Sequence, residues 1–561
     1  MKLSSIISDN MVLQRDVGNR IWGNCETSKN VKVTVLENDT VIAESMCKSG
    51  DDGEFDVTLP VIKTGGPYDI VIEAGEDNVR IKNVLVGDVF LLTGQSNMEL
   101  PVSRTLDLTR EYSSRIDNDR IRHFEVPKEV DFKGPVSDIY GGVWKKADQE
   151  SVYAFSALGY FFAEFVNSEQ DVPVGLLQTA CGGIQIEALI PEEKLLENAR
   201  ILREKAAKRG ETREKDCICN VNHSCKFCYE DIIREDKSDE FISRRIKDDE
   251  KMNYEFYTWL ENNDIGVRNG FKDKTTLFDD GTQPEYINVP NRWEDLDDHS
   301  YLEYVRGSVW VLKRFVLPKE YVGRKARLYL GTVIDADETY INGVEVGRTE
   351  YRYPPRRYEV PEGILKEENV LVVRVKISQR AGGFVEEMPY YLDLFDFKVS
   401  LNGMYEFRIG ANRNPEFSKE TPELPDMTFF LYRPCGMYNK MIYPLRRLKL
   451  KGMLFYQGES NALYHEDYDH LMRIMAESIR ECFEDPGLKM AFVELPYFGQ
   501  EDSERKTDNW NLLRAAQERA KDIPDSVLVD IFDLGFKYEL HPQNKKDVAG
   551  RVYKEFSKLI Y

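Results

Sequence analysis

The chain has 561 residues, more than one hydrophobic core usually supports, so we expect about three domains. Its formal net charge is -22 and its pI is about 5.0, which argues against nucleic acid or an anionic membrane surface as a partner. No stretch approaches the ~20 apolar residues of a membrane span, and the first residues lack the apolar core of a signal peptide. We therefore expect a cytoplasmic protein, or an exported one whose leader was removed, that acts on a small neutral or polar substrate.

The first 86 residues have the pattern of an antiparallel β-sandwich. Short runs such as 31–36 and 69–73 alternate apolar and polar positions, and Gly and Asp residues separate the runs. We expect residues 1–86 to form an N-terminal β domain, in which no catalytic chemistry is visible.

From about residue 87, apolar strands alternate with amphipathic helices. A helical pattern over 154–166, for example, is followed by an apolar run over 172–178. Because strands and helices in alternation form parallel sheets, the sequence predicts the α/β class. We assign residues 87–274 to the first part of this α/β domain.

Residues 191–270 are rich in charged side chains at helical spacing, and we interpret them as a helical elaboration beside the site. They contain four of the nine cysteines of the chain, at Cys217, Cys219, Cys225 and Cys228. Four soft ligands in about a dozen residues suit tetrahedral zinc. Coincidental cysteines or a local disulfide would explain the cluster as well, since this spacing is not one of the commonest for zinc. We expect at most a structural metal here, not a catalytic one.

Alternating apolar and polar residues return over 275–400, where Asn342-Gly343 is a strong hairpin signal. This block is predicted to be a β domain inserted into the α/β domain. The strand and helix pattern then resumes, with apolar runs over 448–456, 489–494 and 526–531 and helical patterns around 466–483 and 508–521. We assign residues 401–561 to the second part of the α/β domain.

Two segments carry the residues that a serine hydrolase needs. Ser96 follows the apolar strand in Gly94-Gln-Ser-Asn97, and His541 precedes a helical segment. Such an enzyme needs a hydroxyl nucleophile, an imidazole base and donors for the oxyanion. Since both residues lie between an apolar run and a helix, we expect them to meet at the carboxyl edge of the sheet. A lone serine there is commonly a helix cap, so the pair needs the support of its wider context.

That context is a resemblance to the sialate O-acetylesterase family of the SGNH hydrolases, which spans nearly the whole chain. The resemblance rests on ordered blocks at 8–15, 21–23, 94–99, 181–188, 452–461 and 541–542. Within the insert, segments 335–343 and 353–358 resemble the jelly-roll module that such esterases share with glycoside hydrolases. The resemblance implies a flavodoxin-type three-layer α/β/α catalytic domain, an N-terminal β-sandwich and an inserted jelly-roll, galactose-binding-like domain.

The resemblance also implies hydrolysis of O-acetyl groups on sugars without a catalytic cofactor. Ser96 would attack the acetyl carbonyl, with His541 as general base and then general acid. The backbone N–H groups of Ser96 and Gly183 and the side-chain amide of Gln457 would bind the oxyanion. Alternatively, Gly183 forms only a tight turn, and Gln457 and Glu459 are buried residues that hold their loop.

The third member of the triad departs from the family pattern. Many SGNH enzymes carry an aspartate three residues before the histidine, and here that position is Tyr538. Glu539 is our candidate for the acid, with Asp533, Asp530 or a Ser-His dyad as alternatives. The expected set of oxyanion and substrate-binding residues is completed by Gln95, Asn97 and Glu459.

Two other readings of the function stay open. The esterase could act on another acetylated glycan such as xylan, because loops and the insert determine sugar specificity. The second alternative is a noncatalytic carbohydrate-binding protein, although the presence of both Ser96 and His541 argues against this function. The expected partner is an O-acetylated sugar or oligosaccharide, first of all 9-O-acetylated sialic acid, and the sequence leaves a homo-oligomer open.

Overall fold

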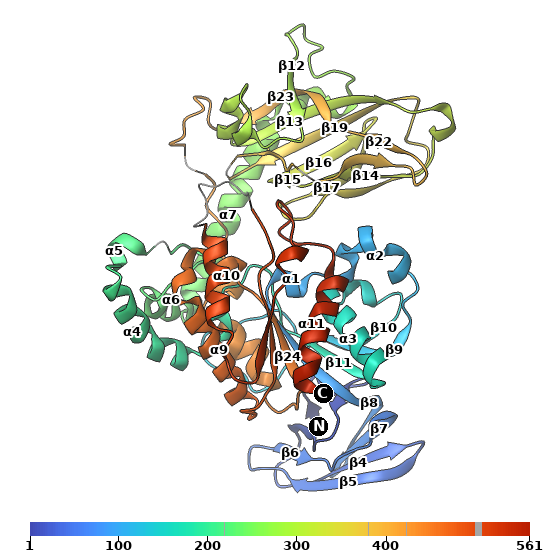
Figure 1. Ribbon diagram of the computed structural model, residues 1–561, viewed down its shortest axis with the longest axis vertical. Helices are drawn as coiled ribbons and strands as arrows, with labels where there is room; N and C mark the ends of the chain where they lie inside the picture. Colours follow the sequence, from blue (N-terminus) through green and yellow to red (C-terminus); the bar gives the residue numbers. More distant parts are fainter. Residues whose placement is uncertain (218, 380, 387, 422, 500–507) are drawn as a thin grey trace. The chain divides into compact units, whose positions relative to one another are not determined.

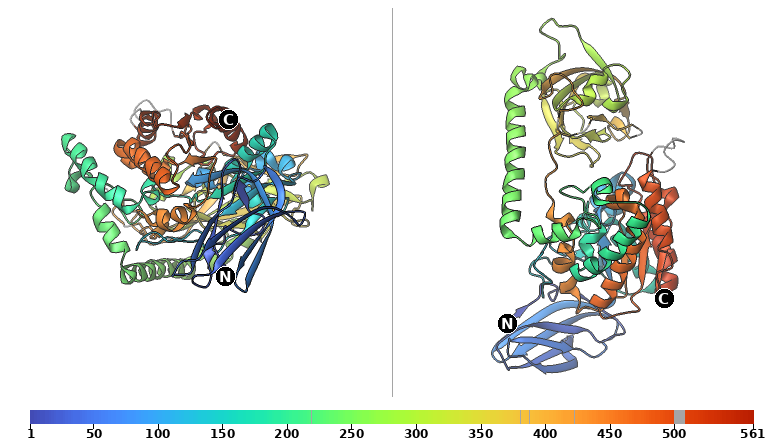
Figure 2. Two further views of the ribbon diagram at one scale, coloured as in Figure 1. Left: turned by 90° about the horizontal axis from the view of Figure 1, so that it is seen from below. Right: turned by 90° about the vertical axis from the view of Figure 1, so that its left-hand side faces the viewer.

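The computed structural model describes residues 1–217, 219–379, 381–386, 388–421, 423–499 and 508–561. The chain divides into two compact units. The first unit comprises Met1–Ile242, Thr428–Phe536 and His541–Tyr561, and the second comprises Ser243–Met427 and Lys537–Leu540. Helix α7 (Asp239–Asn263) carries the chain from the first unit into the second without a break (Figure 2).

The core of the first unit is a mostly parallel sheet with the strand order β10-β9-β11-β8-β24-β25-β26 (Figure 1). Only β10 is antiparallel to its neighbour on this path. Every residue of β11, β24 and β25 is buried, as is typical of a parallel sheet covered on both faces. The strands are β8 (Asp77–Gly94), β9 (Asn118–Glu125), β10 (Trp144–Ala147), β11 (Val174–Gln178), β24 (Gly452–Tyr456), β25 (Met490–Val493) and β26 (Ser526–Val529).

The order of these strands reverses at β8. On one side of β8 lie β11, β9 and β10, which come from the first part of the α/β domain, and on the other lies β24, which comes from the C-terminal part. Gly94 at the end of β8 stands in register with Tyr456 at the end of β24. Open α/β sheets bind ligands at such a reversal, outside the carboxyl ends of the strands.

Helices cover both faces of this sheet (Figure 1). α3 packs against α11 on one face, and α9 packs against α10 on the other. In α9 the buried residues Leu471, Met475 and Ile479 recur every four positions, so one stripe of the helix faces the core. The helices are α1 (Ser96–Glu99), α2 (Leu106–Ser113), α3 (Ala157–Gln170), α9 (Tyr468–Cys482), α10 (Asn509–Arg519) and α11 (Lys545–Ile560).

The N-terminal β-strands are joined to the central sheet through β8 itself. This strand has 18 residues; its first half pairs antiparallel with β7 and its second half pairs in parallel with β11 and β24. The expected boundary at residue 86 falls inside β8, because one strand serves both sheets. The preceding strands (blue in Figure 2) are β1 (Lys2–Leu3), β2 (Val12–Gln14), β3 (Arg20–Asn24), β4 (Asn30–Glu37), β5 (Thr40–Lys48), β6 (Glu54–Thr58) and β7 (Gly65–Ala74).

Helices occupy most of the charged segment 191–270, as its spacing predicted. Their charged side chains lie mainly on the exposed positions, and α4 buries Leu195, Ala199 and Leu202 as an apolar stripe. The helices are α4 (Glu192–Lys208), α5 (Arg213–Asp216), α6 (Tyr229–Asp236), α7 (Asp239–Asn263) and α8 (Ile265–Asn269).

The second unit contains two antiparallel sheets that share one hydrophobic core. The six-stranded sheet has the order β12-β23-β13-β19-β16-β17, and the four-stranded sheet has the order β18-β14-β21-β22. Val311 and Val373 of the larger sheet contact the same core as Leu328 and Leu392 of the smaller one. We expected the β block to end at residue 400, but it extends further because β23 pairs with β12 and β13.

The strands of the second unit alternate buried and exposed residues to different degrees. They are β12 (Glu285–Val289), β13 (Gly307–Val316), β14 (Ala326–Leu330), β15 (Val333–Ile334), β16 (Ala336–Ile341), β17 (Val344–Thr349), β18 (Arg357–Val360), β19 (Glu368–Ile377), β20 (Gly383–Phe384), β21 (Tyr390–Asp393), β22 (Lys398–Ser400) and β23 (Gly403–Asn412). The short strands β15 and β20 pair only with each other.

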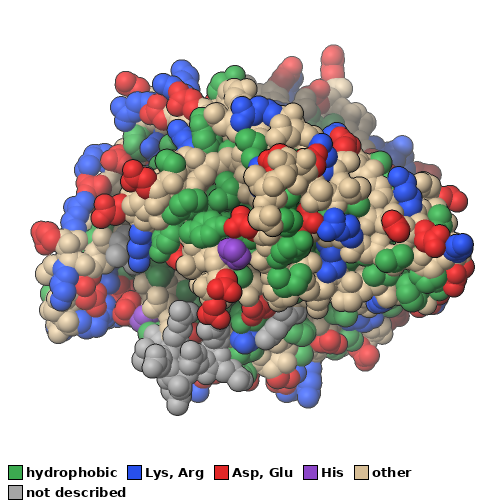
Figure 3. All heavy atoms as spheres, turned by 90° about the horizontal axis from the view of Figure 1, so that it is seen from above, with side chains coloured by type: hydrophobic (Ala, Val, Ile, Leu, Met, Phe, Trp, Pro, Cys, Tyr) green, Lys and Arg blue, Asp and Glu red, His purple; other side chains and the backbone are tan. Residues whose placement is uncertain are grey.

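Acidic and basic side chains are interspersed on the face shown in Figure 3. The negative net charge is therefore not gathered into one acidic patch on that face. Among the described residues, no helix combines the length and the apolar character that crossing a membrane requires.

Candidate active site

Ser96 lies where β8 ends at the carboxyl edge of the central sheet. The strand closes at Gly94, Gln95 has an extended backbone, and α1 begins at Ser96. Gly94 has a φ of +122°, and a Cβ there would lie 2.1 Å from the carbonyl oxygen of Tyr456. Only glycine fits this close approach of the two strand ends. The turn leaves Ser96 partly exposed, as a nucleophile must be.

His541 meets Ser96, although the two residues are 445 positions apart. The Nε2 atom of His541 lies 2.8 Å from the Oγ atom of Ser96. His541 belongs to the segment that leads into α11, at the same edge of the sheet as the end of β8. This distance is within reach for direct proton transfer between a nucleophile and its base.

The imidazole of His541 is neutral at physiological pH. Burial, together with the nearby cations Lys545 and Arg104, lowers the pKa of His541 to about 3. A neutral imidazole has one nitrogen that can accept a proton. With the ring hydrogen on Nδ1, Nε2 can therefore take the hydroxyl proton of Ser96.

A buried lysine joins α1 to the start of α11. Lys545 is fully buried, and its Nζ donates a hydrogen bond of 2.8 Å to Oδ1 of Asn97. Asn97 Nδ2 in turn donates to Oε1 of Glu459 over 2.6 Å, and burial raises the pKa of Glu459 to about 7. Asn97 and Glu459 were expected at the site. Lys545 was not, because a lysine in the first turn of an amphipathic helix is normally solvated and gives no signal of burial.

Two backbone N–H groups are available beside the candidate nucleophile. Gly183 has a φ of +85°, and a Cβ there would lie 2.2 Å from the hydroxyl oxygen of Tyr432, so this turn requires glycine. A Cβ on Gly182 would lie 3.4 Å from the Cβ of Ser96, which places the turn next to the serine. Within the described part of the chain, the N–H groups of Ser96 and Gly183 donate no hydrogen bond, whereas that of Gly182 donates to Glu99.

The side-chain amide of Gln457 is fully occupied inside the protein. Its Nε2 donates to Oε1 of Gln95 (3.1 Å), the carbonyl of Ile184 (3.0 Å) and Oδ1 of Asn461 (2.7 Å). Its Oε1 accepts a 2.6 Å hydrogen bond from the hydroxyl of Tyr468. Two N–H bonds already serve three acceptors, and the side chain has no exposed surface. The geometry therefore favours one of the two expected roles: Gln457 holds its loop in place. It does not favour the other, in which the amide binds the oxyanion.

Gln95 belongs to the same buried network. Its Oε1 also accepts from the backbone N–H of Ser460 over 3.3 Å. The hydroxyl of Ser460 donates to the carbonyl of Gly183 over 2.8 Å, which orients the turn that carries the free N–H. The buried side chain of Gln95 therefore holds the loop after β24 in place, and it does not face a substrate.

The acid of the triad stays a prediction. Glu539 belongs to Lys537–Leu540, which clusters with the second unit, whereas Ser96 and His541 belong to the first. Of the alternatives, Asp533 forms an ion pair with Arg551 at 3.0 Å, and Asp530 accepts the N–H of Phe532 over 2.8 Å. Both aspartates thus have other partners.

A buried carboxyl connects the loop of Gln457 to the helical segment. Glu187 is fully buried and accepts hydrogen bonds from Asn461 Nδ2 (2.9 Å) and from the hydroxyl of Tyr229 (2.8 Å). Burial raises the pKa of Glu187 to about 7. Sequence reasoning missed Tyr229, since a tyrosine that follows a cysteine pair carries no sign of its partner.

The four clustered cysteines come together in the structure, within the first unit. Their sulfur atoms all lie within 4.8 Å of one another. His223, in the same loop, is not part of this group; its Nδ1 lies 3.1 Å from Oδ1 of Asn220.

Comparison with known proteins identifies relatives of parts of the chain. Residues 429–552 match the family described as carbohydrate esterase, sialic acid-specific acetylesterase. Human sialate O-acetylesterase is 27% identical over 200 residues, which cover 33% of this chain and 38% of the human protein. A β-glucuronidase from Formosa agariphila is 30% identical over 166 residues, which cover 29% of this chain and 15% of that enzyme. The chain therefore spans about two fifths of the length of the curated esterase that it matches.

A solved structure resembles the chain over its whole length. The crystal structure of a carbohydrate acetylesterase from Xanthomonas citri matches with a TM-score of 0.54 and 18% identity, covering 100% of this chain and 75% of the other. At this identity the likeness shows a common fold, in which strands and helices are mixed as the α/β class predicts. Residues 429–552 are therefore similar to the sialic acid-specific acetylesterase family of carbohydrate esterases, the family that the sequence motifs had indicated.

Proposed function

We propose that the chain is a serine-dependent esterase that removes O-acetyl groups from sugars, with 9-O-acetylated sialic acid as the first candidate substrate. The observation that carries the proposal is the 2.8 Å approach of His541 Nε2 to Ser96 Oγ at the carboxyl edge of the sheet. The names of the curated relatives and of the family support an acetyl ester as the bond that is broken. No metal or organic cofactor is needed for this chemistry.

The first half of the reaction transfers the acetyl group to the enzyme. Ser96 Oγ attacks the acetyl carbonyl carbon while His541 Nε2 takes the hydroxyl proton. The oxyanion accepts hydrogen bonds from the N–H groups of Ser96 and Gly183, which have no other described acceptor. The intermediate then collapses: the C–O bond to the sugar breaks, His541 returns the proton to the sugar oxygen, and the acetyl group stays on Ser96.

The second half releases acetate. His541 takes a proton from a water molecule, whose oxygen attacks the acetyl carbonyl of the acyl-enzyme. The same two N–H groups bind the second oxyanion. When it collapses, the proton on His541 returns to Ser96 Oγ and acetate leaves. We propose Glu539 as the acid that orients His541; without it, the pair would act as a dyad.

We also propose the finer fold assignment that the resemblance implies. The reversal of strand order at β8 and the helices on both faces support an SGNH-type catalytic domain. The two antiparallel sheets of the second unit support a jelly-roll module. A module of this kind would serve sugar recognition, while the acetyl chemistry belongs to Ser96 and His541.

The proposal is tested by acetate release from 4-nitrophenyl acetate, 9-O-acetylated sialic acid and acetylated xylan. Ser96→Ala and His541→Ala are compared with the wild type, and Ser114→Ala, at an exposed serine of the same unit, is the control. We expect each active-site variant to lose at least about 1,000-fold in kcat, because the nucleophile and its base act as one unit. The control should keep full activity.

The panel also separates the substrates. Serine-dependent activity on sialate supports the first candidate, whereas activity on xylan alone would redirect the assignment to another acetylated glycan. No serine-dependent turnover on any of the three would contradict the esterase and favour a noncatalytic carbohydrate-binding protein.

A further inference from the structure

The four clustered cysteines have the geometry of a metal site rather than of two disulfides. The sulfur atoms of Cys217 and Cys228 are 2.9 Å apart, those of Cys219 and Cys225 are 3.2 Å apart, and those of Cys225 and Cys217 are 3.9 Å apart. A disulfide bond is about 2.05 Å long. Four thiolates around one zinc ion lie about 3.8 Å from one another, given a Zn–S distance of about 2.3 Å. Contacts among all four sulfurs fit one shared centre.

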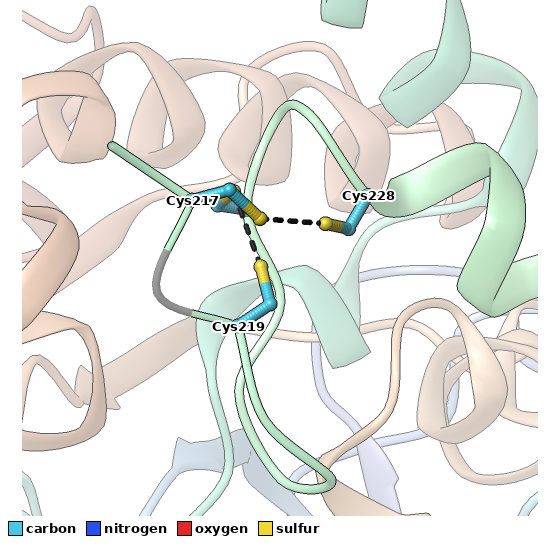
Figure 4. Close-up of side chains that lie close together, drawn as sticks. Cys217, Cys219 and Cys228 are labelled. Carbon is cyan, nitrogen blue, oxygen red and sulfur yellow. Dashed lines mark hydrogen bonds between the residues drawn. The ribbon is translucent and has the colours of Figure 1, made fainter. Parts of the chain in front are cut away.

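The backbone turns the four thiols toward that centre. Figure 4 shows the sulfur atoms of Cys217, Cys219 and Cys228 facing one another. Cys225-Lys-Phe-Cys228 forms a turn closed by a 2.9 Å hydrogen bond from the N–H of Cys228 to the carbonyl of Cys225. The other two cysteines lie between the end of α5 and the turn at Asn220–His223, so the segments before and after this turn supply two ligands each.

The surroundings of the cluster are largely apolar. Cys225 and Cys228 are buried, Cys217 and Cys219 are partly buried, and Ile232, Phe227 and Tyr464 belong to the same hydrophobic cluster. Cys228 directly precedes α6, where the helix N-terminus favours a thiolate. Four soft thiolate ligands that can approach one centre select zinc over the oxygen-preferring cations.

We propose that Cys217, Cys219, Cys225 and Cys228 bind one Zn²⁺ ion as a closed structural site. Four protein ligands complete the tetrahedron and leave no position for water or substrate. The ion would therefore not take part in ester hydrolysis. Its effect is to fix a loop that contains little secondary structure of its own.

This loop contacts the residues that support the candidate active site. The N–H of Ser224 donates to Oε1 of Gln185 over 2.7 Å, and Tyr229 holds Glu187 as described above. Glu187 in turn holds Asn461, which holds Gln457. The zinc loop is thus hydrogen-bonded, through one buried chain, to the loop after β24 that borders Ser96.

The site is tested first by the metal content of the wild-type protein, purified from zinc-supplemented medium without chelators. We expect about one zinc ion per chain by mass spectrometry of the metal. Replacement by Co²⁺ should give the intense near-ultraviolet absorbance of thiolate coordination. Neither measurement needs a variant that folds or a substrate that is known.

Variants locate the ligands. Cys225→Ser and Cys228→Ser should lose most of the bound zinc, whereas Cys47→Ser, which replaces a partly buried cysteine outside the cluster, should keep it. A wild-type protein without zinc, or one in which alkylation shows Cys217–Cys228 and Cys219–Cys225 disulfides, would overturn the proposal.

A third measurement tests the link to the active site, and it rests on the proposed esterase function. Removal of zinc by a chelator should lower the melting temperature and reduce kcat on 4-nitrophenyl acetate about 10-fold, with a smaller change in KM. Zinc that is bound but can be removed without any change in kcat would overturn the link and leave the metal site standing. Failure of the esterase itself would show in the Ser96→Ala comparison, not in the zinc content.

Discussion

Replacing Gln457 by leucine separates the two roles that its position allows. The substitution removes an amide that makes four buried hydrogen bonds. The carbonyl of Ile184 then has no other donor among the described residues, which costs about 1–3 kcal/mol. Asn461, Gln95 and Tyr468 each keep at least one further partner, so each loses only about 0.5–1.5 kcal/mol or less.

The apolar leucine recovers part of this loss, so we expect a net destabilisation of about 2–5 kcal/mol. For a unit of several hundred residues this lowers the melting temperature by roughly 3–6 °C. Differential scanning calorimetry measures the shift, and Gln170→Leu, at a half-buried glutamine in α3, is the control. An oxyanion donor would behave differently: its loss would reduce kcat about 100- to 1,000-fold at an unchanged melting temperature. That result would refute the loop-holding role.

Four further predictions follow from the site. The acid limb of kcat/KM should have its midpoint well below pH 6.5, toward the pKa of His541 of about 3; a midpoint at 6.5 or above would contradict the lowered pKa of the buried imidazole. Because the unfolded histidine binds a proton below about pH 6.5 and the folded one only below about pH 3, stability should fall as the pH drops through that window, which denaturant titrations at several pH values measure. Lys545→Met removes a cation that lowers the pKa of His541, so the acid limb should move to higher pH, whereas Lys546→Met, at a half-exposed neighbour, should leave it unchanged. Gly183→Ala combines a positive φ with a Cβ 2.2 Å from the Tyr432 hydroxyl, so it should cost about 2–5 kcal/mol, and an unchanged melting temperature would contradict the tight turn.

Hydrophobic periodicity was sufficient to predict several elements of the α/β part. The apolar run over 526–531 contains β26, the edge strand of the parallel sheet, and the helical pattern around 466–483 contains α9, which buries one apolar stripe. Domain limits were harder. β8 continues from the N-terminal sheet into the parallel sheet, and β23 extends the β-sandwich past residue 400, so neither boundary coincides with a change of residue pattern.

The residues that meet at the site were predicted in part. Ser96 and His541 could be paired from the sequence because strand ends in a parallel sheet share one edge. The role of Gln457 could not be predicted, since an amide next to a strand can face the substrate or the core. Only its hydrogen-bond partners in the structure show which role it has. Lys545 and Tyr229 could not be found at all, because their burial comes from elements far away in the chain.

The central claim is that Ser96 forms an acyl-enzyme with His541 as its base. The most direct test is to mix the protein with 4-nitrophenyl acetate, quench with acid within the first turnovers, and digest the product for mass spectrometry. We predict an acetyl group on Ser96 of the wild type and none on that peptide in His541→Ala. Acetate release without an adduct on Ser96, or turnover that persists in Ser96→Ala, would contradict the account.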